Sequence, residues 1–545
     1  MTVTDQLDRA LQAIQDRTYW SAYPEHPKAY GEEAPAAGET AFRALLDSPF
    51  DTGQTADGYV AVEESSPFGI DLGITYPATS VEAVMDAAQR AGVAWGRLSP
   101  RARAETCVAI LDALAADGFT MGHAVMHTTG QSFLMAFQAG GPHALDRGLE
   151  AVAYALAEQQ RLPEPVRWEK PQGSRPPLVI DKRWIVRPRG VAVTIGVSTF
   201  PTWNGYPGIF ASLATGNPVV IKPHQATVLP LALFVRTARE VLAARGQDPD
   251  VVQMMVDPVG ERIAKELVTH PAVRIVDYTG GSAFGEWLET NLPGVEVYTE
   301  KAGVNSVILD SAADLASVFR NLSVSMTMYS GQMCTTPQNL FISADGVRTE
   351  DGIVPYDEVV AGFVGAVEGL LGDDTRAAGI LGAVKGTDTV DRLDAAASTG
   401  TVLSASRTVE NAEFPDAVVR TPIIVEVDEG TDAYQHEMFG PVIYVVKTAS
   451  RQASIDRARD AAVERGAITW LAYATDPDAI DRIVDAAVDA GVGVAFNLTG
   501  GLFVNQSAAF SDFHVTGANP AGNASLTDPA FVANRFRVVG IRSET

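Results

Sequence analysis

The sequence predicts an α/β protein with a doubly wound parallel sheet, on the evidence of its alternating segments. From residue 191 onward, short apolar segments alternate with helical ones. Short apolar strands joined by crossover helices form a parallel sheet with helices on both faces. The second half of the chain repeats the alternation less regularly, after an amphipathic helix over residues 312–329. The predicted strands are residues 191–197, 218–222, 251–256, 273–278 and 295–298 in the first unit, then 442–446 and 492–496.

Length and composition limit the classes of protein to which the chain can belong. Its 545 residues are too many for one small core, so we expect two or three domains. The formal net charge of −26 repels phosphate backbones and anionic membranes, which argues against nucleic-acid and membrane partners. Two cysteines provide neither a disulfide framework nor a metal-ligand spacing, so we expect no metal site.

The start of the chain lacks a basic stretch followed by an apolar one, and no run of about 18 apolar residues occurs. We therefore expect a cytoplasmic protein with reduced thiols. Ser99 and Pro100 have the form of a helix start, with an N-cap and a proline at the first position. Cys107 lies in that helix among apolar residues, which predicts a core thiol.

Cys334 and Glu300 are the residue pair that indicates an enzyme. Cys334 follows the amphipathic helix in a loop of Ser, Gly, Thr and Pro, where a reactive side chain is accessible. Its thiolate would attack a carbonyl carbon, and backbone N–H groups of the loop could hold the oxyanion. Glu300 follows the last predicted strand and would activate the water that hydrolyses a thioester. The competing interpretations are a small hydrophobe near a helix end and a solvated or salt-bridged carboxylate.

Asn204 and three further segments are candidates for binding an oxyanion or a cofactor. Asn204 is a neutral donor that could stabilise an oxyanion without protonating it. The turn over residues 278–285 joins a strand to a helix start, which is a natural anion site. A turn Asn, glycines of a tight turn and a capped strand entry are the structural alternatives. The candidate cofactor residues are Lys222, Pro223, His224, Gln225, Thr279, Gly280, Gly281, Ser282, Gly285, Glu437 and Phe439.

In this order, the motifs resemble those of the aldehyde dehydrogenase superfamily over roughly residues 60–505. Cys334, in Gly331 to Cys334, matches the family's nucleophile, Glu300 its general base and Asn204 its oxyanion donor. The resemblance implies that Cys334 adds to an aldehyde to give a hemithioacetal. Hydride then leaves for a nicotinamide to give a thioester, and Glu300 activates the water that releases the acid. The implied fold is aldehyde dehydrogenase-like, with a doubly wound parallel-sheet cofactor domain, an α/β catalytic domain and a small oligomerisation arm.

The resemblance leaves the nicotinamide open between NAD and NADP. Many members of the family carry an acid three places after the lysine, where this chain has Gln225. In those members the acid accepts hydrogen bonds from the adenosine ribose and repels a 2′-phosphate. Since Lys222 and His224 stand nearby, we expect NADP or NAD, with a slight preference for NADP.

The same resemblance implies a division of the chain and an assembly. We expect residues 1–50 to form an N-terminal arm, 51–170 and 190–297 the cofactor domain, 171–189 and 530–545 an oligomerisation arm, 298–505 the catalytic domain, and 506–529 a variable C-terminal segment. The oligomerisation arm predicts a homodimer or homotetramer.

The ends of the chain suggest a branch of the family. The N-terminal arm, with Tyr19, Trp20 and Tyr23, and residues 66–69 resemble the branch named phenylacetic acid degradation protein PaaN. That branch implies aldehydes from aromatic catabolism of the phenylacetate type, including ring-cleavage semialdehydes carried on coenzyme A.

Three other functions compete with hydrolytic aldehyde oxidation. A coenzyme A-acylating aldehyde dehydrogenase would pass the thioester to coenzyme A, but Glu300 favours hydrolysis. A thiol hydrolase needs a His partner for the cysteine, and none is evident. A non-catalytic binding protein on the same scaffold is the third, and the intact Cys334, Glu300 and Asn204 count against it.

Overall fold

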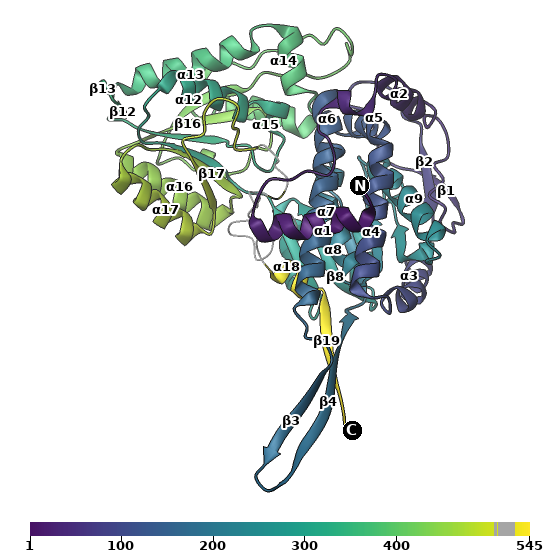
Figure 1. Ribbon diagram of the computed structural model, residues 1–545. Coiled ribbons are helices and arrows are strands. Elements are labelled where there is room, and N and C mark those ends of the chain that lie inside the picture. The colour runs from purple at the N-terminus through teal and green to yellow at the C-terminus, as the bar shows by residue number, and fades with distance from the viewer. Residues whose placement is uncertain (506–509, 511–528, 545) are drawn as a thin grey trace.

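The computed structural model describes residues 1–505, 510 and 529–544. Two lobes lie side by side, and a three-stranded arm projects from one of them (Figure 1). The first lobe contains the N-terminal helices and a five-stranded sheet, and the second contains a seven-stranded sheet (Figure 1). The segment that we expected to vary, residues 506–529, lies almost wholly outside the described residues.

The five-stranded sheet is parallel throughout, which confirms the predicted fold class. Its order is β7-β6-β5-β8-β9, so the chain winds outward from β5 in both directions. Val191 and Val193 of β5 enter one core and Ala192 enters another, because successive side chains of a strand point to opposite faces. The strands are β5 (Val191–Ile195), β6 (Val219–Lys222), β7 (Val252–Met254), β8 (Val273–Gly280) and β9 (Glu296–Lys301).

Helices cover both faces of this sheet, as a doubly wound fold requires. One face is covered by α4, α7, α8 and α9, and the other by α3, α10 and α11. The bounds are α3 (Val81–Trp95), α4 (Pro100–Ala116), α7 (Pro142–Gln160), α8 (Pro201–Ala214), α9 (Leu229–Ala244), η2 (Pro249–Val251), α10 (Ala264–Thr269) and α11 (Ser282–Asn291).

The N-terminal helices complete the first lobe. The Ser99 hydroxyl accepts a hydrogen bond from the Ala102 amide at the start of α4, as the sequence predicts. Cys107 is fully buried in that helix, which confirms it as a core thiol. Tyr23 of the N-terminal segment is buried, whereas Tyr19 is 71% exposed, so not every aromatic of this segment packs on the body. The remaining elements are α1 (Val3–Asp16), η1 (Pro27–Tyr30), α2 (Ala34–Arg43), β1 (Gly58–Ala61), β2 (Thr75–Ala78), α5 (Gly118–Thr129) and α6 (Phe133–Gly140).

The second lobe is a sheet of order β14-β15-β16-β11-β10-β17-β18, parallel except for β14. Helices α12 to α14 pack on one face and α15 to α17 on the other. The strands are β10 (Ser306–Leu309), β11 (Asn339–Ser343), β14 (Thr401–Ser404), β15 (Ile423–Asp428), β16 (Val442–Thr448), β17 (Thr469–Tyr473) and β18 (Gly493–Phe496). The other elements are α12 (Leu315–Ser325), η3 (Met328–Gly331), β12 (Val347–Thr349), β13 (Gly352–Val354), α13 (Tyr356–Leu371), α14 (Asp374–Leu381), α15 (Thr387–Ala396), η4 (Ala433–Gln435), α16 (Arg451–Arg465) and α17 (Pro477–Ala490).

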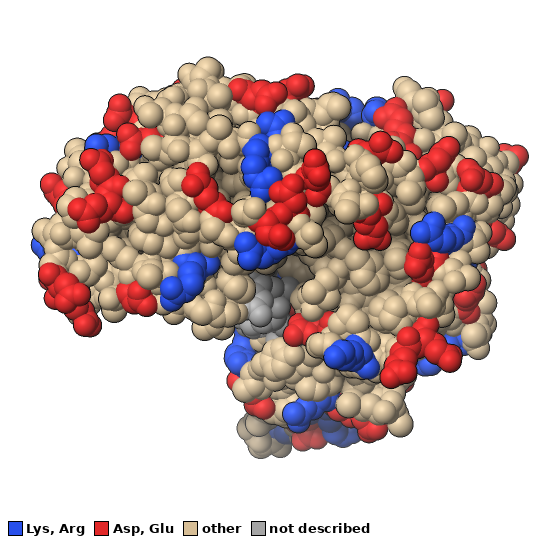
Figure 2. Space-filling model, turned by 90° about the horizontal axis from the view of Figure 1, so that it is seen from above, with Lys and Arg blue, Asp and Glu red and all other residues tan. Residues whose placement is uncertain are grey.

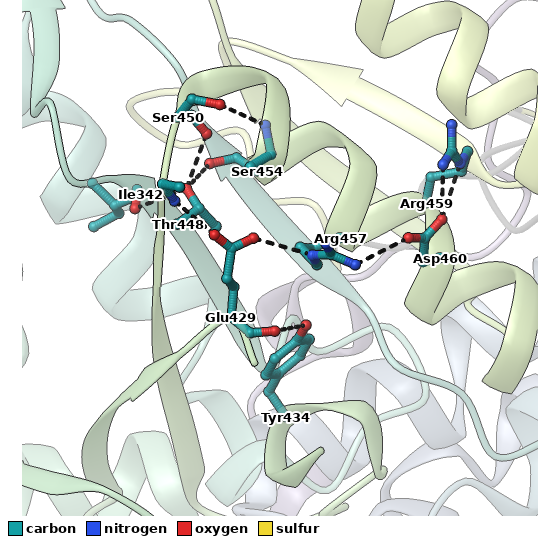
Figure 3. A network of polar contacts seen from close by, with 11 residues as sticks. Ile342, Glu429, Tyr434, Thr448, Ser450, Ser454, Arg457, Arg459 and Asp460 are labelled. Atoms are coloured by element: carbon teal, nitrogen blue, oxygen red, sulfur yellow. Dashed lines mark hydrogen bonds and ion pairs between the residues drawn. The ribbon is translucent and has the colours of Figure 1, made fainter. Parts of the chain in front are cut away.

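A polar network fixes the approach to the segment that carries Glu437 and Phe439 (Figure 3). Glu429, just past β15, accepts hydrogen bonds from the Ala449 amide at 2.8 Å and from Arg457 Nε of α16 at 3.1 Å. The hydroxyl of Tyr434, in η4, donates to the Glu429 carbonyl at 3.1 Å (Figure 3). The loop that leads to Glu437 is therefore tied to the body of the second lobe.

The arm consists of β3 (Val166–Gln172), β4 (Arg175–Pro188) and β19 (Phe536–Glu544), paired antiparallel in the order β19-β4-β3. Arg535 ties its base to the first lobe, because its guanidinium makes two hydrogen bonds, at 2.6 and 2.8 Å, to the fully buried carboxylate of Asp277 in β8. The sheet begins at Val166, before the boundary that we placed at residue 171.

Two surface properties bear on possible partners. Asp and Glu side chains are scattered over the face of the molecule seen in Figure 2, in keeping with the net charge of −26. No single helix among the described residues is both long and apolar enough to cross a membrane, although α4 and α5, bent by 76° at the break between them, pass that test as a pair.

Candidate active site

A cavity of about 560 Å³ lies at the carboxyl ends of β5, β6, β8 and β9, where ligands bind in parallel sheets. Cys334, Glu437 and Phe439 close it from the second lobe. Of the predicted site residues, Asn204, Lys222, His224, Gln225, Thr279, Gly280, Gly281, Glu300, Cys334, Glu437 and Phe439 line it.

Pro223, Ser282 and Gly285 are not among the residues that line this cavity. Ser282 is the first residue of α11. A Cβ at Gly285 would come within 2.6 Å of Lys301 Cγ, so this glycine permits the close approach of α11 to β9. The packing of α11 against β9 is therefore enough to explain why residue 285 is a glycine.

The three predicted catalytic residues meet at one point. Asn204, in the first turn of α8, donates from Nδ2 to Glu300 Oε2 at 3.0 Å. Glu300 is 1% exposed in β9, and its carboxylate lies near enough to the Cys334 thiol to raise the pKa of that thiol. A nucleophile, a carboxylate and an amide donor thus converge from three separate elements.

The turn before Cys334 is strained. Tyr329 and Ser330 both have φ of 51°, in the left-handed region, where a residue other than glycine costs about 1–3 kcal/mol. Gly331 has φ of 68°, and a Cβ there would lie 2.4 Å from the Gly440 carbonyl oxygen. Side-chain hydrogen bonds hold the turn in this conformation: Tyr329 donates to the Thr129 carbonyl and Ser330 to the Leu381 carbonyl.

Asn305 positions the residues that follow the turn. Its Nδ2 donates to the carbonyls of Cys334 at 2.6 Å and Thr336 at 3.3 Å. Its Oδ1 accepts from the amides of Ile468 and Thr469. The sequence analysis missed Asn305, although a polar residue directly before an apolar strand was a signal that could have found it.

The protonation of Cys334 is set by its surroundings. Burial raises the pKa of the thiol well above its usual value, and the neighbouring carboxylates of Glu300 and Glu437 raise it further. The positive charge of Arg147 opposes this rise. Arg147, in α7, donates from Nε to the Trp203 carbonyl at 3.3 Å, and its guanidinium lies 3.9 Å from the centre of the Trp203 ring. No local motif marks Arg147 in the sequence, because only the fold brings α7 to Cys334.

The sequence suggested that no acid stands near Lys222, but the structure places one beside it. Lys222 forms a buried ion pair with Asp257, whose other oxygen accepts from the Ile263 amide at 2.9 Å. Burial lowers the pKa of His224 to about 4, so this histidine is neutral at neutral pH. An acid from the segment after β7 therefore lies beside Lys222, a long-range placement that sequence spacing cannot show.

Glu437 and Phe439 face the cavity from the second lobe. The Gly303 amide donates to Glu437 Oε1 at 3.2 Å. Burial raises the pKa of Glu437 to about 7, against the effect of this hydrogen bond. Phe439 has φ of 39°, which turns the chain sharply before β16.

A second cavity, of about 400 Å³, opens on the other side of Cys334. Cys334 and Phe200 line both cavities. The second is mostly apolar, and its lining includes Met135, Met328, Met333, Trp203 and Phe503. A ligand in each cavity would therefore meet the other at the sulfur of Cys334.

Comparisons with known proteins agree with this geometry. Residues 75–497 match the model of the aldehyde dehydrogenase family. The crystal structure of an NAD-dependent aldehyde dehydrogenase from Burkholderia multivorans superposes with a TM-score of 0.96 at 47% identity, covering 99% of this chain and 98% of that one.

Curated relatives are more distant. Geranial dehydrogenase from Castellaniella defragrans is 25% identical over 396 residues, which cover 71% of this chain and 76% of that protein. An alpha-ketoglutarate semialdehyde dehydrogenase from Haloferax volcanii is 28% identical over 329 residues, or 58% and 63% of the two chains.

The charges around Cys334 predict how fast its thiol reacts. Replacing Glu300 by Gln removes a negative charge, so the pKa of Cys334 falls and a larger share is thiolate at neutral pH. Alkylation by iodoacetamide should quicken, by up to about tenfold for each unit by which the pKa falls. Arg147→Met should slow it. Mass spectrometry of the Cys334 peptide measures the rate.

Two controls accompany this measurement. Cys107, buried with a pKa raised to about 12, reports any general opening of the fold. Glu286→Gln removes a carboxylate from an exposed position of α11 and should leave the rate unchanged. Equal rates in wild type, Glu300→Gln and Arg147→Met would show that neither charge acts on the thiol.

Proposed function

The chain belongs to the aldehyde dehydrogenase family, and on that premise we propose that it oxidises an aldehyde to a carboxylic acid through a covalent intermediate on Cys334. The observation that carries the proposal is the place of Cys334, which lines one cavity together with Glu300 and a second, apolar cavity. The apolar cavity receives the aldehyde, and the cavity at the strand ends receives the nicotinamide cofactor.

The residues of the larger cavity fit a dinucleotide. The start of α11 offers backbone amides, because its N-cap, Gly281, makes no side-chain cap bond. A Cβ at Gly281 would meet nothing within 4 Å, so phosphate oxygens can approach this backbone. Lys222 and Glu437 would hold ribose hydroxyls, and Phe439 would lie against the nicotinamide. The bound nicotinamide supplies the hydride acceptor that no side chain provides.

Cys334 and Asn204 perform the first half of the reaction. The sulfur adds to the aldehyde carbon, and the carbonyl oxygen becomes an oxyanion. The Asn204 amide carries two hydrogens, so it can donate to this oxygen while it orients Glu300. Arg147 favours the thiolate form of the nucleophile. Loss of hydride from the same carbon leaves a thioester on Cys334.

Glu300 performs the second half. Its carboxylate takes a proton from water, and the hydroxide oxygen bonds to the thioester carbon. The carbon–sulfur bond then breaks, which releases the acid and regenerates Cys334. The place of both residues in the wall of one cavity supports this assignment, because water that attacks the thioester must come within reach of the same carboxylate.

The choice of nicotinamide and the metabolic role are further parts of the proposal. Arg262 and Lys265 also line the cavity and could receive a 2′-phosphate, which supports the slight preference for NADP. Asp257 and the neutral His224 weaken that preference. The apolar second cavity is compatible with aldehydes from aromatic catabolism of the phenylacetate type. The cytoplasmic location and the absence of nucleic-acid and membrane partners stay predictions from composition.

The projecting arm supports assembly into a homodimer or homotetramer. It exposes apolar side chains on all three strands, among them Trp168, Ile185 and Val539. Ile185 of β4 lies directly opposite Val539 of β19, so the two form one apolar patch. Such a patch on a projecting sheet is typical of an interface. The division into a cofactor domain, a catalytic domain and this arm stays part of the same proposal.

Two substitutions test the catalytic roles. Cys334→Ala should abolish nicotinamide reduction and preserve cofactor binding. Glu300→Gln should slow turnover by about 10²–10⁴-fold and let a thioester accumulate, since proton removal from water is lost. Intact-mass spectrometry after acid quench measures the adduct. Wild-type turnover should need no added coenzyme A. Near-normal turnover by Cys334→Ala, or an unchanged rate without adduct in Glu300→Gln, would contradict the assignments.

The nicotinamide preference is measured as the ratio of kcat/KM with NADP to that with NAD. We expect a ratio above one in the wild type. Lys265→Met should lower the ratio on the order of tenfold, because a charge-assisted contact to the 2′-phosphate is lost. A wild-type ratio below one would show that the preference is for NAD.

Sedimentation equilibrium tests the assembly. The wild type should sediment as a dimer or tetramer, and Ile185→Glu should shift the mass toward the monomer because a charge enters the apolar patch. Val488→Glu is the matched control, since Val488 is 73% exposed in α17, which belongs to the second lobe and not to the arm. A monomeric wild type would rule out the proposed interface.

A further inference from the structure

The residues that line the apolar cavity beyond Cys334 indicate the charge of the ligand that it can bind. Among the described residues that line it there is no Lys or Arg, and the single carboxylate is that of Glu25. Phe503 and Asn505 line the cavity with an aromatic ring and a neutral amide. The cation Arg147 is buried behind Trp203 and is not among the lining residues.

Resting on the function proposed above, we propose that the substrate is an aldehyde without charge along the part that fills this cavity, and that Glu25 excludes aldehydes with a carboxylate at the far end. A carboxylate that enters a mostly apolar cavity gives up water and needs a cation or several donors in exchange. The described lining offers amide and hydroxyl groups from Gln138, Ser132 and Asn505, together with a repelling carboxylate.

The N-terminal segment places Glu25 at the opening of the cavity. The side chain of Glu25 is 58% exposed, whereas that of its partner His143 is 19% exposed, so Glu25 is the outer member of the pair. Glu25 Oε2 lies 2.9 Å from His143 Nε2, and Gln138 Nε2 donates to the Glu25 carbonyl at 3.3 Å. Because His143 is already paired with Glu25, it cannot bind a substrate carboxylate without giving up that pair.

A second anchor one turn along α7 fixes the same segment. Asp146 accepts hydrogen bonds from the Ser21 hydroxyl at 2.5 Å and from the Ala22 amide at 3.0 Å. His143 and Asp146 are three residues apart, so they lie on one face of the helix. Two contacts on that face therefore hold residues 21–25 against α7, with Glu25 in the lining of the cavity. Glu25 thereby becomes a specificity-determining residue that the parallel-sheet fold alone does not supply.

The remaining lining suits an uncharged chain or ring. Met135, Met328 and Met333 are unbranched and polarizable, so they can adapt to different apolar shapes. Trp203 and Phe200 offer flat surfaces next to Cys334. Discrimination between aldehydes then depends on charge at the far end more than on exact shape.

Matched aldehydes test the inference with the intact enzyme and nicotinamide. The pairs are hexanal with 6-oxohexanoate and benzaldehyde with 4-carboxybenzaldehyde, which share the reacting group and differ in a distal carboxylate. In the wild type, kcat/KM for the uncharged member should exceed that for the charged member by at least about tenfold. Glu25→Gln should reduce this ratio through a lower KM for the charged aldehyde, and Glu25→Lys should reduce it further.

Glu32→Gln is the matched control, because Glu32 is an exposed carboxylate of the same N-terminal segment that does not line the cavity. Its ratios should equal those of the wild type. Equal or faster oxidation of the charged aldehydes by the wild type would overturn the inference while the proposed function stands. A ratio that survives both Glu25 substitutions would overturn the role of Glu25. Failure to oxidise any aldehyde would instead contradict the proposed function.

Discussion

The arrangement of this protein depends on the approach of Cys334 to Glu300, because the two lobes meet where these side chains line one cavity. The turn before the cysteine adopts left-handed backbone at Tyr329 and Ser330, and it persists because hydrogen bonds to Thr129, Leu381 and Asn305 fix both sides of it. Strain at such a position is stable only when the surrounding structure determines it more than once. Small displacements of either lobe would separate the sulfur from the carboxylate.

The surroundings of Cys334 also explain why its thiol needs a nearby positive charge. Burial and two carboxylates raise the pKa of Cys334, which would leave it a poor nucleophile. Arg147 opposes that rise from behind Trp203, and Trp203 directly precedes Asn204. One short stretch of α8 therefore connects Arg147, whose charge favours the thiolate, to Asn204, the proposed oxyanion donor. Asp146 and His143 hold the N-terminal segment against α7, and Glu25 of that segment lines the apolar cavity.

The sequence was enough to predict those features in which a local pattern of residues determines one local structure. The strand-helix alternation from residue 191 predicted the parallel sheet, because short apolar runs with crossover helices have few other solutions. The loop around Cys334 and the end of the strand at Glu300 predicted that the two residues meet in one site, and both line the larger cavity, because parallel strands deliver their carboxyl ends to one edge.

The other residues of the site could not be found in this way. Asp257, Arg147, His143 and Glu25 act through partners far away in the chain, and no spacing rule connects them. Lys222 illustrates the difference. Its position at a strand end was evident, but the ion pair that neutralises it comes from the segment after another strand. Gly285 shows the reverse case, in which a glycine read as part of an anion site has a sufficient explanation in the packing of α11 on β9.

On the proposed mechanism, Cys334 stands between a nicotinamide cavity and an aldehyde cavity. A crystal structure of the wild-type enzyme with oxidised nicotinamide dinucleotide bound would show whether it does. We predict that the nicotinamide ring lies beside Phe439 in the larger cavity and faces the sulfur of Cys334 across a gap that admits one carbonyl carbon, with reacting atoms about 3–3.5 Å apart. A ring bound in the apolar cavity, or held away from the sulfur with Cys334 closed off from both cavities, would contradict the account.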